Sequence, residues 1–430
     1  MDEHPIRITV TDDLGRSRLT VFFRLLLAIP HLIALFLWTI AALLAGIVNW
    51  FATLFKGRSP KGLHDFLSSY LRYATHVYAY VFLATNPFPG FGGERGYPID
   101  LEIDPPARQS RWTIALRIVL ALPALLLAGV FIGGCGGGGA GGRGGGGGSD
   151  DQAGRAAAEF FFSSGGVGWT VAFLAWFACL ARGRMPQGFR DLLAYVLRYA
   201  AQAWGYVFLL TDRYPNSDPR DPASPQPVPE HPIGLSVADD LRRSRLTVFF
   251  RLLLTFPHFV WITLWWIAAF AAAVANWIAT LILGRPPRPL HRFLSAFVRY
   301  ETHVIAYLFL VANPFPGFVG RAGSYPVDPE LPPDERQRRW VTAFRMLLAI
   351  PALIVAGAVG TAAFVAAFLG WFAALAQGRM PEGLRNLGAY YLRYNAQVSG
   401  YALYLLTDRY PYSGPSEHVE PEPEEPKPEE

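Results

Sequence analysis

The chain has 430 residues, of which 52% are hydrophobic, 14% aromatic and 17% charged. About a quarter of the residues in a soluble domain are charged, so this composition excludes an ordinary soluble protein and indicates a lipid environment. The formal net charge is +5, and the arginines recur singly within apolar segments instead of forming a dense basic patch, which argues against nucleic-acid binding.

The first predicted element is an apolar segment from Val21 to Phe55, in which Arg24 is the only charged side chain. A membrane span needs only about 20 residues, and a signal peptide has a shorter apolar core, so we expect this segment to remain as a membrane anchor. Pro30 should kink the helix, or separate a short interfacial piece that carries Arg24 from a span that begins near His31.

A Gly-Arg-Ser-Pro turn at 57–60 leads to a tyrosine-rich second helix at 63–85. The glycine ends one helix and the proline opens the next, which explains the turn without a phosphate-binding role. One polar stripe follows the second helix at helical spacing: Asp65, Ser69, Arg72 and His76. Such a stripe either lines a cavity or packs against another repeat.

The second quarter, 111–213, repeats the first, 1–110, because RWTIALRIVLALP matches RLTVFFRLLLAIP. Its apolar segment carries an insertion at 133–165 that includes GGCGGGGAGGRGGGGG, a composition typical of a disordered loop. A glycine loop inside hydrocarbon would leave peptide groups unpaired, so the insertion point is expected near a membrane interface. Each long apolar segment would then be a helical hairpin.

The third and fourth quarters, 231–338 and 339–412, repeat the first two. The segment 12–91 returns as 239–318, and both copies end in NPFPGF, so the halves 1–213 and 231–412 are a tandem duplication. A proline-rich linker, 214–230, joins the halves, and 413–430 is an acidic Pro/Glu tail that buries too little apolar surface to fold. Without the seven glutamates and one lysine of this tail, the body carries about +11, which suits an anionic lipid surface.

Three repeated strings carry a resemblance to a known family: RLTVFFRLLLAIPH, GRSPKGLHDFLSSYLRYATHVYAYVFL and NPFPGF. They resemble the bacterial, mainly actinobacterial, membrane proteins of the domain of unknown function 4389 family, in two tandem copies. The resemblance covers nearly all of the chain except the linker, the insertion and the tail. It implies a membrane location and assigns no activity, so no catalytic residue is carried over from it.

The repeats predict an all-α fold, a polytopic integral membrane bundle of four tandem helical repeats. Eight spans, two per quarter, put 21 of the 38 basic residues on the side of the termini and 11 on the other, whereas four spans give 19 against 17. The positive-inside rule therefore favours eight spans, parallel quarters and cytoplasmic termini in the bacterial cell membrane. With four spans, neighbouring quarters are inverted.

Two rows of arginines lie within the apolar and tyrosine-rich segments, where a charge at mid-bilayer is costly. We interpret them as candidate lipid- or anion-binding residues, since a guanidinium group matches the geometry of a phosphate. The eight candidates are Arg72, Arg198, Arg299, Arg393, Arg24, Arg117, Arg251 and Arg345. The alternative is that their charged ends reach the membrane interface, flanked by tyrosines that favour the same layer.

The sequence motifs indicate neither a cofactor nor a metal site nor an enzyme. His64 and His76 are 12 residues apart, about 120° around a helix, which does not suit a shared metal, and the chain has no recognisable nucleophile motif. We therefore expect a non-enzymatic membrane protein that binds or organises anionic lipids, with lipids, itself or other membrane proteins as partners. A small-solute or ion transporter or channel built from the repeats is the alternative, and a lipid enzyme is the third possibility.

Overall fold

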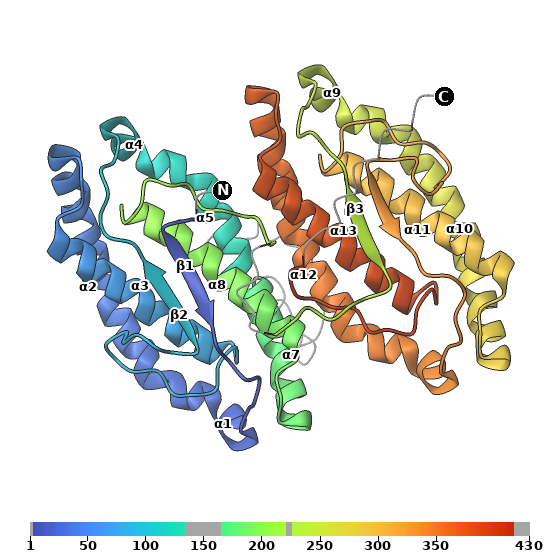
Figure 1. Ribbon diagram of the computed structural model, residues 1–430, viewed down its shortest axis with the longest axis horizontal. Helices are drawn as coiled ribbons and strands as arrows, with labels where there is room; N and C mark the ends of the chain where they lie inside the picture. The colour runs from blue at the N-terminus through green and yellow to red at the C-terminus, as the bar shows by residue number, and fades with distance from the viewer. Residues whose placement is uncertain (1–2, 134–164, 221–225, 417–430) are drawn as a thin grey trace, which may run out of the picture. The chain divides into compact units, whose positions relative to one another are not determined.

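The computed structural model describes the chain in three ranges, 3–133, 165–220 and 226–416 (Figure 1). The predicted disordered insertion at 133–165 and the predicted tail at 413–430 lie largely outside these residues. Within the described ranges the chain is mostly helical, with four short strands.

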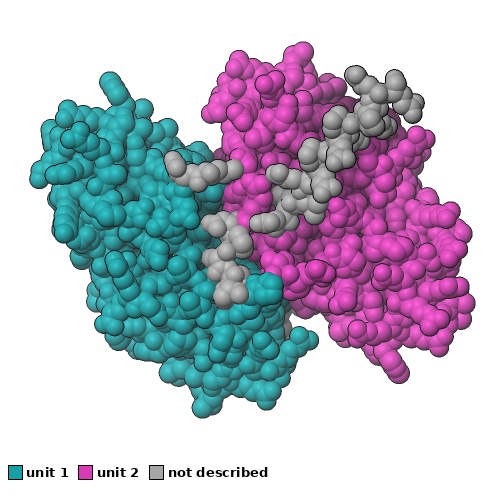
Figure 2. Space-filling view, in the orientation of Figure 1, with its two compact units in different colours: residues 1–217, 222–227 teal, residues 218–221, 228–430 magenta. Residues whose placement is uncertain are grey.

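The chain folds into two compact units, coloured separately in Figure 2. Unit 1 comprises residues 1–217 and 222–227, and unit 2 comprises residues 218–221 and 228–430. The predicted halves fall one in each unit. The predicted linker, 214–230, is divided between the two units.

The first quarter of unit 1 is a helical hairpin with a strand before and after it. Its elements are β1 (Ile6–Val10), α1 (Arg18–Phe22), α2 (Arg24–Lys56), α3 (Lys61–Val81) and β2 (Ile99–Ile103). Gly57 ends α2 in the left-handed region, with φ of 70°, which glycine adopts without steric cost. Pro60 then precedes the first residue of α3, so the turn lies where the glycine and proline predict it.

The second quarter lies antiparallel to the first in unit 1 (Figure 1). Its elements are α4 (Arg111–Ala115), α5 (Arg117–Ile132), α7 (Val167–Arg182) and α8 (Gln187–Val207). Trp50, near the end of α2, donates a hydrogen bond from Nε1 to the carbonyl of Ile114 in α4, and Trp176 of α7 donates to the carbonyl of Val21 in α1. The end of the long helical segment of each quarter therefore meets the start of the long segment of the other quarter. Neighbouring quarters that are inverted relative to each other have this arrangement.

Unit 2 repeats this plan with continuous long helices. Its elements are β3 (Gly234–Val237), α9 (Arg245–Phe249), α10 (Arg251–Leu283), α11 (Arg288–Leu308), β4 (Val327–Glu330), α12 (Arg339–Gln377) and α13 (Glu382–Ala402). Trp277 donates to the carbonyl of Thr342 and Trp371 to that of Val248, as the matching tryptophans of unit 1 do. The two units thus share one architecture.

The prolines of the long helices do not divide them. Pro30 lies inside α2, and the helical break lies earlier, at Phe23, so the short helix α1 ends before Arg24 and does not carry it as expected. Pro257 and Pro351 likewise lie inside α10 and α12, which are single helices and not helical hairpins. The loss of the helical hydrogen bond that each proline removes therefore does not end the helix.

A two-stranded antiparallel ribbon covers the tyrosine-rich helices of each unit, a feature absent from the predicted all-α fold. In unit 1 the register pairs Ile6 with Ile103 and Val10 with Ile99, and β2 contacts α3 while β1 contacts α8. Alternation of side chains turns Ile6, Ile8 and Val10 inward and leaves Thr9 exposed. In unit 2, β3 and β4 form the corresponding ribbon.

The long helices expose a broad apolar face. Within the described residues, three helices are long and apolar enough to cross a membrane: α2, α10 and α12. The exposed face of α2 runs along its whole length, from Leu25 at 60% exposure to Phe55 at 75%. Its narrow buried stripe consists mainly of small or polar side chains: Arg24, Ala28, His31, Leu35, Ala42, Asn49 and Thr53.

Candidate functional site

Four of the predicted arginines stand at corresponding positions near the start of the long apolar segments and are buried. Arg24, Arg117, Arg251 and Arg345 are each at most 2% exposed. Each guanidinium carbon lies over a tyrosine ring, from 4.0 Å for Arg117 over Tyr206 to 4.9 Å for Arg345 over Tyr401. Such stacking stabilises a cation that has been removed from water.

Three of these arginines, Arg24, Arg251 and Arg345, bind peptide carbonyls at the carboxyl ends of the tyrosine-rich helices, whereas Arg117 donates to the side chains of Gln109 and Asp212. Arg24 donates to the carbonyl of Thr85 at 3.1 Å, and Arg345 donates to the carbonyls of Tyr401 and Thr407 at 2.9 and 3.0 Å. These carbonyls lie at or just beyond a helix end, where peptide oxygens lack partners and the helix dipole favours a cation. In this structure these arginines therefore hold the helix hairpin closed.

The other four predicted arginines, in the tyrosine-rich helices, also contact protein groups. Arg72 donates to the carbonyl of Leu101 at 2.9 Å, and Arg299 forms an ion pair with Asp328 at 3.0 Å. Arg393 donates to the carbonyl of Gly414 at 2.7 Å, and Arg198 lies 5.4 Å from the centre of the Tyr195 ring. Their predicted lipid role stays a prediction, and it would require some of these internal contacts to be exchanged.

An acidic partner beside Arg72 was missed by sequence reasoning. Asp100 lies 3.6 Å from Arg72 Nε and accepts hydrogen bonds from His76 Nε2 at 2.9 Å and from the amide of Gly96 at 2.7 Å. Burial opposes ionisation of Asp100, but these hydrogen bonds together outweigh it and hold the pKa of its carboxyl below the usual value. The signal was the repeated Tyr-Pro-Ile-Asp and Tyr-Pro-Val-Asp strings at 97–100 and 325–328.

A further set of arginines is exposed at the ends of the apolar faces. Arg18 donates to the carbonyl of Ala181, and Arg111 donates to that of Phe55, so each begins one quarter and contacts the helix end of the other. Arg245 and Arg339 make the same contacts in unit 2. These exposed cations lie beside strongly exposed aromatic side chains such as Trp112, at 81% exposure.

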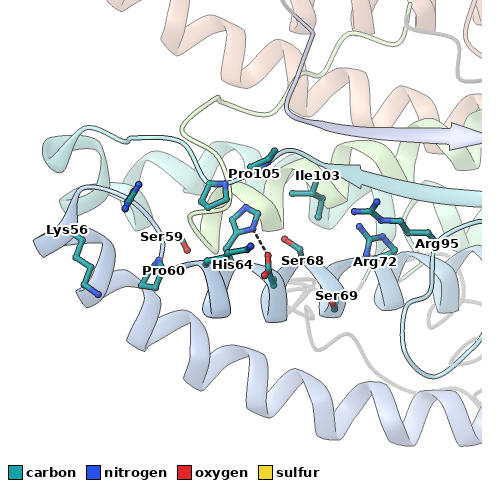
Figure 3. A pocket seen from close by; sticks show the side chains of 14 residues that line it. Lys56, Ser59, Pro60, His64, Ser68, Ser69, Arg72, Arg95, Ile103 and Pro105 are labelled. Atoms are coloured by element: carbon teal, nitrogen blue, oxygen red, sulfur yellow. Dashed lines mark ion pairs between the residues drawn. The ribbon is translucent and has the colours of Figure 1, made fainter.

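A basic groove opens in quarter one at the end of α2 (Figure 3). It has a volume of about 900 Å³ and runs between the first turns of α3 and the segment that follows β2. Five basic side chains and one acidic one line it: Lys56, Arg58, Lys61, Arg72 and Arg95 with Asp65. Figure 3 shows Lys56 at one end and the Arg72–Arg95 pair at the other.

One buried hydroxyl that lines the groove has no hydrogen-bond partner. It is Oγ of Ser68, a residue 7% exposed. His64 is 3% exposed, and burial lowers its pKa, although Asp65, whose Oδ1 lies 3.7 Å from His64 Nδ1, and a backbone hydrogen bond with Leu210 oppose this. Of the predicted polar stripe, Asp65, Ser69 and Arg72 line the groove, and His76 contacts the ribbon through Asp100.

A metal site has no support among the residues that the structure describes. Within these ranges there is no group of three or more His, Cys, Asp or Glu side chains arranged to hold a metal ion. Cys179 is a free, buried thiol. Cys135 lies outside the described residues.

These features define a class of protein, a repeat protein built from helical hairpins whose apolar faces suit a membrane. The chain belongs to the family described as domain of unknown function (DUF4389), whose model matches residues 18–92, 161–217, 245–319 and 339–413. One match falls in each predicted quarter, so the family's repeating unit is the quarter. No curated protein and no solved structure matches the chain.

Proposed function

We propose that this protein is a non-enzymatic membrane protein that binds and organises anionic lipids, with each unit lying in the plane of the membrane. The apolar faces of the long helices then enter the boundary between headgroups and acyl chains, and the ribbon faces water. The observation that carries this proposal is the position of the polar ribbon along the long helices.

Contacts place the ribbon of unit 1 at the level of the middle of α2. Thr39, at the midpoint of α2, hydrogen-bonds the hydroxyl of Tyr70 in α3 at 2.9 Å. Two residues further along α3, Arg72 binds the carbonyl of Leu101 in β2. If α2 crossed the bilayer symmetrically, the ribbon would therefore lie at the depth of the hydrocarbon centre.

The outer side of the ribbon is unsuited to that depth. Arg7 forms an ion pair with Asp104 at 2.9 Å and lies 3.8 Å from Glu102, and the two acidic side chains are 45% and 57% exposed. Placing a charge at mid-bilayer costs about 2.5–3.5 kcal/mol on insertion scales, and an open sheet edge leaves peptide groups unpaired there. An orientation in the membrane plane leaves the ribbon in water.

The length of α2 points to the same orientation. Its 33 residues span about 50 Å, whereas the hydrocarbon core of a bilayer is about 30 Å thick. Because the apolar face continues to Phe55, a perpendicular helix would leave roughly 20 Å of apolar surface outside the core. A helix in the interface plane covers the whole face.

Exposed cations at both ends of the apolar face favour anionic lipids as the contact. Arg18 and Arg182 are exposed at one end in unit 1, and Lys56, Arg58 and Arg111 at the other. A basic residue near an anionic surface contributes about 1 kcal/mol. The multi-pass arrangement with cytoplasmic termini, favoured by the basic-residue counts, stays the alternative orientation.

The lipids that copurify with the full-length chain test the lipid preference. Purified in a mild non-ionic detergent, the protein should carry anionic phospholipids enriched several-fold over the membrane from which it was extracted, as measured by lipid mass spectrometry. A copurified composition equal to that of the membrane would contradict the proposal.

The transporter alternative gains no specific observation from the described residues. It needs polar groups that line a path between the two sides of the membrane. The polar stripe of α3 instead faces the ribbon through His76 and Arg72, and the basic groove through Asp65 and Ser69.

A further inference from the structure

We propose that the basic groove of quarter one binds a phosphate group, most directly the phosphate of an anionic lipid headgroup. This inference rests on the proposed function and deepens it, because it assigns one specific site in addition to general attraction to an anionic surface. The charge of the groove, its unpartnered Ser68 hydroxyl and its position support this inference.

The charge of the groove suits a phosphate. Lys56, Arg58, Lys61 and Arg95 are exposed cations around the opening, and Asp65 is the only acidic side chain that lines it. The groove also contains the first turn of α3, whose N-cap residue is Pro60 and makes no side-chain capping hydrogen bond. The first peptide N–H groups of a helix and its dipole attract an anion.

Ser68 supplies an independent indication of a ligand. A buried hydroxyl without a partner is unfavourable, so such a group is usually satisfied by a hydrogen bond. The same unpartnered hydroxyl recurs at the matching position of quarter three, Ser295 Oγ. The recurrence shows that the hydroxyl belongs to this position of the fold and not to one local side-chain arrangement.

The position of the groove suits a lipid in particular. Lys56 and Arg58, which line its opening, directly follow the last exposed apolar residue of α2, Phe55. A phosphate in the groove therefore allows the attached acyl chains to lie along the apolar face of α2. The phosphate receives hydrogen bonds and charge from the groove, and the chains stay in contact with apolar surface.

The test uses the full-length chain and two variants with equal changes of charge. The groove variant is Arg58→Gln/Lys61→Gln/Arg95→Gln. The matched control is Arg213→Gln/Arg336→Gln/Arg409→Gln, three exposed arginines that neither line the groove nor belong to the cations named at the ends of the apolar face. All six side chains are exposed, so both variants should fold. Native mass spectrometry in detergent gives the dissociation constants of short-chain phosphatidylglycerol and of phosphatidylcholine with the same acyl chains.

We expect the unmodified chain to bind phosphatidylglycerol more tightly than phosphatidylcholine. The groove variant should weaken phosphatidylglycerol binding by about 10- to 100-fold, since each cation near an anionic group contributes about 1 kcal/mol. The control should change it less than about threefold by the same reasoning, because those cations do not line the groove. Ser68→Ala should weaken binding without lowering the unfolding temperature, an effect that a purely structural hydroxyl would not have.

The outcomes separate this inference from the proposed function. Equal weakening in the groove and control variants would overturn the groove site and leave general anionic-surface binding in place. Absence of any preference for phosphatidylglycerol would overturn both. Added inorganic phosphate that displaces phosphatidylglycerol from the unmodified chain, but not from the groove variant, would support the site with free phosphate as a second source of the same chemistry.

Discussion

At the scale of single residues, each quarter repeats one way of closing its helix hairpin. The residue after the C-cap of the tyrosine-rich helix is a leucine with positive φ in three quarters, and a leucine with positive φ also follows α13: Leu83, Leu209, Leu310 and Leu405. The carbonyl of each accepts a side-chain donor from the segment before a long helix, Arg16, Gln109, Arg243 or Gln337. A non-glycine residue in this region costs roughly 1–2 kcal/mol, so these contacts hold a strained turn in place.

Arg345 offers a direct test of this structural role. Its guanidinium group is fully buried and donates to four acceptors. These are the carbonyls of Tyr401 and Thr407, Gln337 Oε1 at 2.8 Å and Asp408 Oδ1 at 3.0 Å. Lysine cannot reach all of these acceptors, so Arg345→Lys should lower the free energy of unfolding in detergent micelles by about 2–4 kcal/mol.

The exposed neighbour Arg339 is the control for this substitution. Arg339→Lys should change the free energy of unfolding by less than about 0.5 kcal/mol. If Arg345→Lys leaves stability unchanged and instead reduces the copurified anionic lipid, the arginine acts as the lipid ligand that the sequence pattern suggested.

The sequence predicted the equivalence of these arginines and missed their partners. Equal spacing in four repeats shows that Arg24 and Arg345 occupy matching positions. The acceptor of Arg24 and two of the four acceptors of Arg345 are peptide carbonyls, which every residue carries, so no residue type marks these acceptors in the sequence. Asp100 was identifiable only from its repetition as Asp328, because the loop between it and α3 has no regular period.

At the scale of secondary-structure elements, the apolar helices followed from hydropathy and the ribbons did not. The alternation of Ile6, Ile8 and Val10 is a strand signal, but it lasts only five residues and its partner strand lies at 99–103. Long-range pairing of this kind leaves little local pattern. The mean hydropathy of a helix gives its apolar content, but it does not show which elements pack against the buried face of the helix.

Lysine substitutions along the exposed face of α2 test the orientation of this element. Leu26, Leu37 and Val48 are 62%, 61% and 56% exposed, and their 11-residue spacing places them on one face. In the membrane plane all three lie at one depth, so Leu26→Lys, Leu37→Lys and Val48→Lys should cost the same to within about 0.5 kcal/mol.

A helix that crosses the bilayer gives a different profile. Leu37 would then lie near the centre, so Leu37→Lys should cost about 2 kcal/mol more than the two flanking substitutions, and that result would contradict the proposed orientation. Thr9→Lys on the exposed side of β1 serves as the control. It should change the free energy of unfolding in lipid bicelles by less than about 0.5 kcal/mol.

At the scale of the whole molecule, the repeats defined the architecture and left its relation to the membrane open. The quarters were visible as matching strings, and a family match falls in each of them. Counts of basic residues favoured parallel quarters with two spans each, whereas the long helical segments of the two quarters in unit 1 run antiparallel (Figure 1). The chain returns through the ribbon strand β2 between α3 and α4, a path that hydropathy does not reveal.

The orientation of unit 1 is tested most directly by the two ends of its first hairpin. In a background without Cys135 and Cys179, single cysteines at Ser17, before α1, and at Lys61, after α2, are exposed to an impermeant maleimide added to one side of sealed membrane vesicles. An orientation in the membrane plane predicts that both positions react from the same side, together with a cysteine at Thr9 on the ribbon. Reaction of Ser17→Cys and Lys61→Cys from opposite sides would show that α2 crosses the membrane and would contradict the account.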